Sequence, residues 1–419
     1  MFKQEAKDLL LYSKIGIAKT TAILVIFILV GASLTLTYFM TMQTDAFPAS
    51  SSKPVSPQTW AKTYYGVSGD NSNSRRDGRG YSIIQSSDGG YAVTGYAITP
   101  DGPLKWDVLL VKIDAFGNLQ WEKTYGGLYD DFGYSVIESS DGGFVIAGWA
   151  NSLNNVGGDV YLIKTDAAGN MLWNRTYDGV LGNSVIESDD GYLIAGYSYS
   201  QGNYDVYLVK TDLSGNLQWT KTYGDKDSDE YGYSIIAAST DEGYVITGYT
   251  INSASQTSAY LVKVDSNGNM TWDNIYAAND YTTAYSVAKS SDEGYILTGG
   301  SSLIKTDYNG NMQWSKSLGN ESEIKTRSII QVNDGYLIAG YAAAPPLGPV
   351  VIFGVYLVKT DLYGNILWNN TYGGWGYDYC YSVIQSFDGD YVAAGYTQSP
   401  EYNGGVFVVK TDTSGKIQS

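Results

Sequence analysis

Short runs rich in β-branched and aromatic residues follow one another along most of the chain, separated by Gly, Asp and Asn. In one stretch the runs are Tyr233 to Ala238, Tyr244 to Thr250, Ala259 to Asp265 and Met270 to Tyr276. Runs of this length and composition, bounded by turn residues, predict β-strands. No stretch after residue 40 shows a helical period long enough to compete. The pattern therefore predicts an all-β domain.

The four-strand pattern recurs, and a tryptophan marks each copy: Trp60, Trp121, Trp173, Trp219, Trp272, Trp314 and Trp368. A period of about fifty residues is typical of a propeller blade. The last copy stops where its tryptophan strand is due, whereas the first copy opens with an unpartnered tryptophan strand at residues 59–65. We therefore expect residues 59–65 to complete the sheet of residues 379–412, which closes a seven-bladed β-propeller of four-stranded blades.

Two tight turns recur in the copies. In the turn Asp212 to Asn216 (DLSGN), Asp caps the turn and Gly takes the left-handed conformation, and turns such as Ser86 to Tyr91 (SSDGGY) repeat this one hairpin earlier. Each DxxGN turn has too few acidic ligands for a closed calcium site. A lysine such as Lys210 lies two residues before each turn Asp, and we expect this Lys and Asp to pair locally on one strand face.

The N-terminal region has a different pattern. Residues 20–44 contain no charged side chain, and Ala22 to Met40 is almost wholly apolar, long enough to span a bilayer as a helix. Lysines precede this run, so the positive-inside rule places the N-terminus in the cytoplasm and the remainder outside. A cleaved signal peptide is the alternative. We expect a basic cytoplasmic N-terminus at 1–19, a transmembrane anchor at 20–40, a Ser/Pro linker at 41–57 and the propeller at 58–419.

Composition narrows the choice of partners. The chain of 419 residues has a net charge of −17, no histidine and one cysteine, Cys380. An acidic surface argues against nucleic acid as a partner. The missing histidine excludes histidine triads and bases, and the single cysteine excludes an intrachain disulfide and a cysteine zinc cage. We expect a monomeric propeller that needs no cofactor, with calcium as a possible ligand.

The copies contain TYGG at Thr124 and Thr371, YSVIESSDGGFVIAGW at Tyr134 to Trp149 and DVYLVKTDLSGNLQW at Asp205 to Trp219. These motifs resemble the units WxKTYGG, SxDGGYxIAGY and DVYLVKTDxxGNxxW of seven-bladed β-propeller repeat proteins of archaeal and bacterial cell surfaces. The resemblance covers residues 58–419. It implies a propeller fold and an exported, surface-exposed location, and it implies no catalytic residues. The fifth copy departs most, since it lacks the spacer before Ser301.

Binding residues are expected where the copies differ. Both tight turns fall on one face of a propeller, so the variable loops fall on the other face, which is the usual place for a binding site. Acidic residues gather there before the innermost strands, where they would ring the channel mouth and attract a cation or a basic ligand. The alternative is that each acid caps its own strand. These residues are Asp77, Asp130, Asp131, Asp229, Glu230, Glu323 and Asp378.

Three classes of function compete. The first is a non-enzymatic extracellular binding module for a protein, glycan or cation. The second is a hydrolase or lyase that acts on extracellular polysaccharide with channel carboxylates. The third, a quinoprotein-like redox enzyme, is disfavoured because a vicinal cysteine pair is impossible. A sialidase-like site is also disfavoured, since three of the five arginines fall in one loop. The sequence favours the binding module and leaves its ligand open.

Overall fold

The computed structural model describes residues 59–64, 78–99, 105–151, 157–200, 202–239, 243–277, 282–320, 322–344, 352–373, 376–398 and 405–417. Every regular element in these ranges is a β-strand. No helix among the described residues has the length and apolar character needed to cross a membrane. The expected cytoplasmic segment, anchor and linker lie outside the described residues.

The strands form seven antiparallel sheets of four. The first three sheets are β2–β5 (Gly78–Gln85, Tyr91–Thr99, Lys105–Ile113, Leu119–Tyr125), β6–β9 (Asp131–Glu138, Phe144–Ala150, Asp159–Thr165, Met171–Tyr177) and β10–β13 (Leu181–Ser188, Gly191–Ser200, Asn203–Asp212, Leu217–Tyr223). The next three are β14–β17 (Ser228–Ala237, Gly243–Asn252, Thr257–Asp265, Met270–Tyr276), β18–β21 (Ser286–Lys289, Tyr295–Gly299, Ser302–Thr306, Met312–Ser317) and β22–β25 (Ile324–Val332, Gly335–Ala344, Ile352–Asp361, Ile366–Tyr372).

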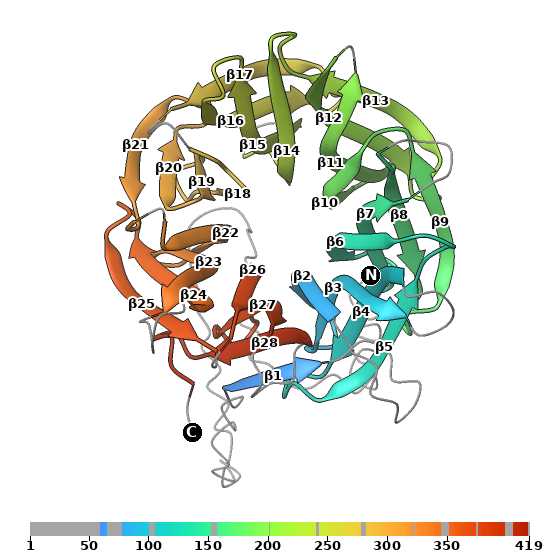
Figure 1. Ribbon diagram of the computed structural model, residues 1–419, viewed down its shortest axis with the longest axis vertical. Coiled ribbons are helices and arrows are strands. Elements are labelled where there is room, and N and C mark those ends of the chain that lie inside the picture. The colour runs from blue at the N-terminus through green and yellow to red at the C-terminus, as the bar shows by residue number, and fades with distance from the viewer. Residues whose placement is uncertain are drawn as a thin grey trace, which may run out of the picture. The chain divides into compact units, whose positions relative to one another are not determined.

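The seventh sheet joins distant parts of the chain. It contains β26 (Asp378–Gln385), β27 (Tyr391–Thr397) and β28 (Gly405–Thr411), with β1 (Trp60–Tyr64) as its outer strand. β1 runs antiparallel to β28, with Trp60 opposite Lys410 and Tyr64 opposite Val406. The seven sheets stand around a central axis with the first strand of each innermost (Figure 1). The fold is a seven-bladed β-propeller, and we refer to the sheets in chain order as blades 1 to 7.

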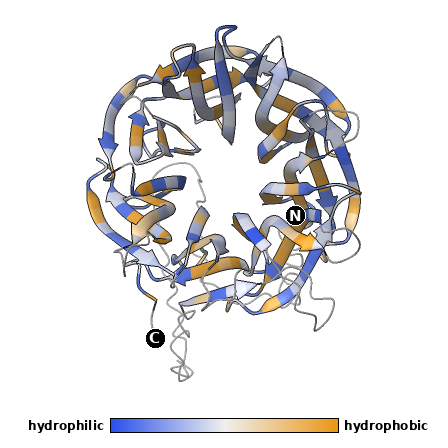
Figure 2. Cartoon of the chain, in the orientation of Figure 1, coloured by the Kyte–Doolittle hydropathy of each residue, from blue (hydrophilic) through white to orange (hydrophobic). Residues whose placement is uncertain are grey.

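The core lies between neighbouring blades, because the middle strands are apolar on both sides. In β12, Val206 and Leu208 pack with residues of blade 4, whereas Tyr207 and Val209 pack with residues of blade 2. Hydrophobic residues accordingly fall within the strands of each sheet (Figure 2). Both faces of this strand are therefore covered by neighbouring blades.

A second contact between blades uses the tryptophan and the turn glycine. The Trp60 ring lies against Gly117, where a Cβ would come within 2.8 Å of the ring. Tyr64 donates a 2.8 Å hydrogen bond to the carbonyl of the same glycine. We call this contact the Trp–Gly clasp. It joins each blade to the next through the pairs Trp60–Gly117, Trp121–Gly169, Trp173–Gly215, Trp219–Gly268, Trp272–Gly310, Trp314–Gly364 and Trp368–Gly415.

A third contact between blades uses a serine that recurs on the innermost strands, after Tyr in most blades. The backbone N–H of Val136 in blade 2 donates to Ser82 Oγ in blade 1, and that of Ile83 donates to Ser382 Oγ in blade 7. These bonds occupy donors on the strand edge that has no strand partner. The accepting serines are Ser82, Ser135, Ser184, Ser286, Ser328 and Ser382, at donor–acceptor distances of 3.2 to 3.3 Å.

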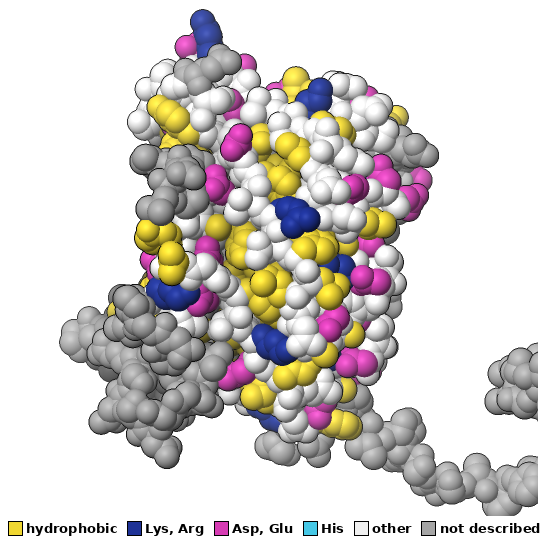
Figure 3. Space-filling model, turned by 90° about the vertical axis from the view of Figure 1, so that its right-hand side faces the viewer, with side chains coloured by type: hydrophobic (Ala, Val, Ile, Leu, Met, Phe, Trp, Pro, Cys, Tyr) yellow, Lys and Arg dark blue, Asp and Glu magenta, His cyan; other side chains and the backbone are white. Residues whose placement is uncertain are grey.

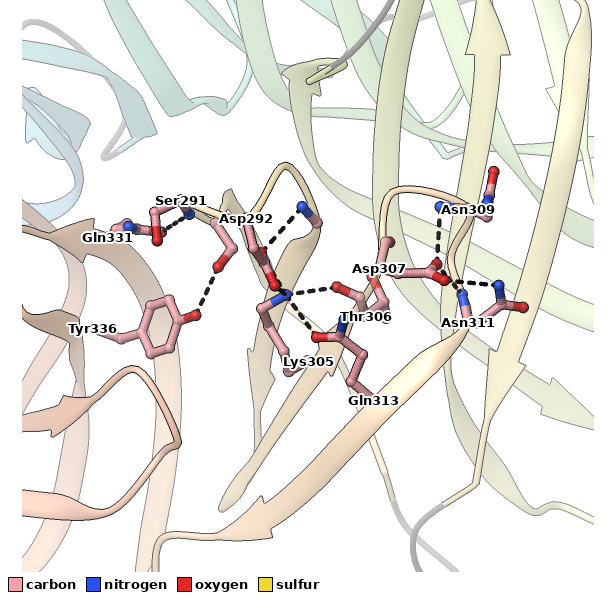
Figure 4. A network of polar contacts seen from close by, with 12 residues as sticks. Ser291, Asp292, Lys305, Thr306, Asp307, Asn309, Asn311, Gln313, Gln331 and Tyr336 are labelled. Carbon is pink, nitrogen blue, oxygen red and sulfur yellow. Dashed lines mark hydrogen bonds and ion pairs between the residues drawn. The ribbon is translucent and has the colours of Figure 1, made fainter.

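The prediction for the recurrent lysines is wrong in its partner. Lys305 Nζ lies 2.8 Å from Asp292, which belongs to the earlier SxDxG turn rather than to the turn that follows the lysine (Figure 4). The following Asp307 is already occupied by the backbone N–H groups of Asn309 and Asn311 and by the Asn311 side chain. The same pairing recurs in Lys112–Asp88, Lys164–Asp141, Lys210–Asp190, Lys359–Asp334 and Lys410–Asp388.

Candidate functional site

The loops of unequal length lie on the face opposite the two tight turns. They follow the second and the fourth strand of a blade, for example between β3 and β4 and between β5 and β6. The tight turns, such as residues 86–90 and 114–118, close the opposite ends of the same strands. We call the first side the variable-loop face, and the candidate acidic residues within the described part all lie near it.

Two of these acids bind backbone groups of the neighbouring loop. Asp130 accepts a 2.9 Å hydrogen bond from the N–H of Trp106, and Asp229 accepts the equivalent bond from Tyr204. Both carboxylates therefore order the start of the third strand of the preceding blade. This is the local structural role that the sequence left open as the alternative to ligand binding.

The next residue in each of these copies forms a buried carboxylate pair. Asp131 and Asp107 are 4% and 5% exposed, and a Cβ at Gly126 would lie 2.7 Å from one carboxylate and 2.0 Å from the other. Asp131 accepts from the Gly127 N–H, while Asp107 accepts from Thr99 Oγ1 and Lys105 Nζ. Burial, reinforced by the charge of Asp107, raises the pKa of Asp131 to about 6 despite the Gly127 bond.

A second pair repeats this arrangement two blades later. Glu230 accepts from Thr250 Oγ1 and from the Asp225 N–H, and both Glu230 and Asp205 lie close to Gly224. Burial raises the pKa of Glu230, with a further contribution from Asp205. Both pairs are held by hydrogen bonds from their own loops and, for Glu230, from Thr250 on the adjacent strand β15.

The other predicted acids lie apart from these pairs. Asp378 is fully buried at the first position of β26, against Gly373. Glu323 is exposed and accepts from Asn320 Nδ2, and Asp77 lies outside the described residues. Within the described ranges, no group of three or more His, Cys, Asp or Glu side chains has a geometry suited to a metal ion. Among the described residues, Asp131 and Glu230 thus each lie beside an acid that was not predicted, Asp107 and Asp205, rather than beside a predicted acid of another blade.

Sequence reasoning missed the main feature of this face, which is aromatic. In every blade except blade 5, the residue before the recurrent serine lies at a bulge of the innermost strand, as the register shifts between Gly80 and Ser82 and between Gly133 and Ser135 show. The side chains at these bulges meet across blades: the Tyr81 ring lies 4.6 Å from that of Tyr381 and 5.3 Å from that of Tyr134. Bulges commonly re-aim a side chain in this way.

Further rings extend these contacts around the propeller. Successive ring centroids are 4.5 to 6.4 Å apart. The contacts run from blade 2 through blades 1, 7, 6, 5 and 4 to blade 3, and Arg327 links Tyr341 to Tyr285. We call this set the aromatic belt: Tyr81, Tyr96, Trp106, Phe132, Tyr134, Trp149, Tyr197, Tyr199, Tyr204, Tyr231, Tyr233, Tyr249, Tyr285, Tyr341, Phe353, Tyr377, Tyr379, Tyr381 and Tyr396.

The rings of the belt are accessible in part and uncharged, and the guanidinium groups of Arg79 and Arg327 lie against some of them. Tyr199 and Tyr377 are exposed, and most of the other rings are half-buried. Burial raises the pKa of Tyr81, Tyr134 and Tyr233, so these hydroxyls keep their protons at neutral pH. By contrast, Figure 3 shows acidic, basic and hydrophobic side chains interspersed on a part of the outer wall. The abundance of tyrosine, 39 residues, was the signal in the sequence.

Two hollows open on the variable-loop face. The larger, of about 460 Å³, lies between the loops of blades 4, 5 and 6 and is lined by side chains that include Tyr285, Lys325, Arg327 and Tyr341. The smaller, of about 330 Å³, lies between blades 3 and 4 and contains Asp229, the one predicted site residue that lines either hollow.

Comparison with known proteins supports the fold alone. No protein-family model matches the chain, and no curated protein matches it in sequence. Among solved structures, Sqt1 from Chaetomium thermophilum is 10% identical, with a TM-score of 0.50, and the match covers 80% of this chain and 96% of that one. A puromycin hydrolase mutant complexed with PGG is 13% identical, with a TM-score of 0.54, covering 85% and 56%. A protein of unknown function from Bacteroides caccae is 11% identical, with a TM-score of 0.43, covering 68% and 97%. The likenesses to Sqt1 and to the puromycin hydrolase mutant bear on the β-propeller fold and on nothing beyond it.

Proposed function

We propose that this protein is a non-enzymatic binding module of the cell surface, and that its ligand is a glycan bound on the aromatic belt. The belt is the observation that carries the proposal. Aromatic faces carry partial negative charge, whereas the C–H groups of a sugar ring carry partial positive charge, so the two stack without a net charge on either. Because this stacking needs no charge on the aromatic ring, it is compatible with the chain's net charge of −17.

The location is part of the same proposal. Residues 20–40 anchor the protein in the membrane as a single span, and the propeller is extracellular, consistent with the apolar run and the lysines before it. Deleting residues 20–40 is expected to move the protein from a carbonate-washed membrane pellet to the soluble fraction. A full chain that carbonate washes off the membrane would contradict the anchor.

The test of glycan binding compares two pairs of exposed tyrosines in the full chain, purified in mild detergent. Tyr199 and Tyr377 belong to the belt, whereas Tyr308 and Tyr363 are exposed on the tight-turn face. Retardation of the protein in gels that contain soluble polysaccharides measures binding. Replacing both belt tyrosines by Ala is expected to weaken binding about tenfold or more, by analogy with the stacking of a nucleic-acid base on one aromatic side chain, which contributes about 1–3 kcal/mol. The tight-turn pair is expected to leave binding unchanged.

Retention of no polysaccharide, or equal loss in both variant pairs, would contradict the proposal. Running the gels with calcium and with a chelator tests the calcium interpretation of the acid pairs. Assaying new reducing ends tests the alternative function, a hydrolase or lyase acting on extracellular polysaccharide. The buried carboxylate pairs give that alternative little support, because a general acid or nucleophile must reach the glycosidic bond.

A further inference from the structure

The larger hollow exists because blade 5 is short. β19 and β20 contain five residues each, whereas β15 in blade 4 and β23 in blade 6 contain ten. Only Gly300 and Ser301 join β19 to β20, so blade 5 has no long loop between its second and third strands. The neighbouring blades therefore form walls around a gap of about 460 Å³, a size that suits one or two sugar residues.

Arg327 gives this hollow its character. It stands at the position before the recurrent serine, where Tyr81, Tyr134, Tyr233, Tyr285 and Tyr381 stand in five other blades. Its guanidinium lies 4.0 Å from the centroid of the Tyr285 ring and donates a 3.3 Å hydrogen bond to Tyr341 Oη. Among the described residues, no carboxylate pairs with Arg327. Its charge is therefore supported by aromatic rings rather than neutralised.

The remaining lining completes a site for an acidic, polyhydroxylated ligand. Lys325 adds a second cation, and Thr257, Thr283 and Ser322 add hydroxyl groups. Among the described residues that line the hollow none is acidic, although the chain as a whole is strongly acidic. Glu323, next to Ser322 in the sequence, is bonded to Asn320. A guanidinium fork binds a carboxylate in a bidentate manner, and tyrosine faces stack on a sugar ring.

We infer that this hollow binds the uronic-acid residue of an acidic polysaccharide, with Arg327 holding the sugar carboxylate between Tyr285 and Tyr341. The inference rests on the proposed glycan-binding function and names its ligand class. Uronic acid is the choice because the lining combines cations with aromatic faces and several hydroxyl groups. An acidic peptide would be bound by the cations, and its binding would not require the aromatic faces and the hydroxyl groups.

The test uses the full chain in mild detergent and two probes that differ only at C6: oligosaccharides of β-1,4-linked glucuronic acid and the matching oligosaccharides of glucose. Titration calorimetry measures both affinities. The wild type is expected to bind the uronate at least about tenfold more tightly, because a charge-assisted bond is lost in the neutral sugar. Raising the salt concentration is expected to weaken uronate binding only.

Two arginine variants provide the matched comparison. Arg327→Tyr restores the residue that most blades have at this position, so the propeller is expected to keep its melting temperature within a few degrees while the preference for the uronate disappears. Arg175→Gln removes a guanidinium on the outer strand β9, which lies over the Trp173 ring, and is expected to change neither affinity.

The outcomes separate this inference from the proposed function. Equal binding of the two sugars, or unchanged uronate binding in Arg327→Tyr, would overturn the inference and leave the glycan proposal standing. Failure of both sugars to bind while poly-glutamate binds in an Arg327-dependent manner would overturn both, because the ligand would then be an acidic peptide. Preference for the uronate that Arg327→Tyr abolishes and Arg175→Gln preserves would support it.

Discussion

At the scale of residues, the feature with the clearest thermodynamic consequence is the buried Asp131. Its pKa of about 6 is above the ordinary value of 3.8, because burial and the nearby Asp107 disfavour its charged form. A carboxyl whose pKa is raised on folding binds its proton more tightly in the folded protein than in the unfolded chain. Compared with the protein at high pH, it contributes stability that is fully present below about pH 4, where the carboxyl is protonated in both states. This contribution is lost as the pH rises through about 6.

Asp131→Asn is therefore expected to become more stable relative to the wild type as the pH rises from 4 to 7. The asparagine keeps an oxygen for the Gly127 N–H but carries no charge. The relative gain is expected to be on the order of 1–3 kcal/mol in the free energy of unfolding. Urea denaturation at both pH values measures it. The exposed Asp227→Asn serves as the control, and a pH-independent difference between wild type and Asp131→Asn would refute the argument.

Residue roles were predictable from the sequence only where they are local. The acids of the variable-loop face were identified, but their partners belong to other strands, as with Asp130 and the N–H of Trp106. Arg327 escaped notice as a site residue because a single substitution in one copy resembles ordinary variation. Its importance depends on the short blade beside it, which only the structure places against the hollow.

At the scale of elements, two separate constraints require a glycine in the DxxGN turn. In Gly268, φ is +74°, which disfavours a side chain, and a Cβ would also lie 2.6 Å from the Trp219 ring of the preceding blade. Gly142 in an SxDGG turn has φ of +80° but no atom within 4 Å of its Cβ position. The pair separates backbone strain from the Trp–Gly clasp.

Gly142→Ala is expected to lower the free energy of unfolding by about 1–2 kcal/mol, because an alanine is disfavoured in the left-handed backbone conformation. Gly268→Ala is expected to lower the free energy of unfolding by about 1–3 kcal/mol more than Gly142→Ala does, because the tryptophan ring must move. Thermal and urea unfolding of the two variants measure the difference. Equal losses would show that the clasp contributes nothing beyond the turn itself.

The hairpins were predicted well because the residues that determine each tight turn lie within five consecutive positions of the sequence. The clasp was not predicted, although the recurrence of tryptophan was noticed, because the sequence does not reveal which turn each ring covers. The lysine pairing was misassigned for a related reason. Asp212, two residues after Lys210, is already bonded to Asn216, so the lysine takes Asp190 from the adjacent hairpin.

At the scale of the whole molecule, the fold was predictable because seven copies repeat one weak signal. The variable-loop face was not, since its loops differ from copy to copy. β1 provides the fourth strand of the last sheet by pairing with β28. We expect this pairing to close the ring, because without it β28 would present an open edge and Gly117 would lose its clasp.

Deleting residues 60–64 from the full chain is expected to lower the melting temperature by about 10 °C or more and to promote aggregation through the edge of β28. Deleting residues 49–53, a stretch of equal length in the expected linker, is the control. Scanning calorimetry and light scattering measure both effects. A propeller that melts alike in the two deletion variants would show that β1 is dispensable.

The Trp–Gly clasp runs in one direction around the propeller, since every blade supplies its tryptophan to the blade that follows. Blade 7 receives Trp368 from blade 6 and supplies Trp60 to Gly117 of blade 1, in the same way as the other six blades. The turn at residues 412–416 has the same backbone hydrogen bonds as the other DxxGN turns. No blade is therefore first or last in a structural sense. The covalent break could be moved by circular permutation to another blade's hairpin without changing any contact between blades.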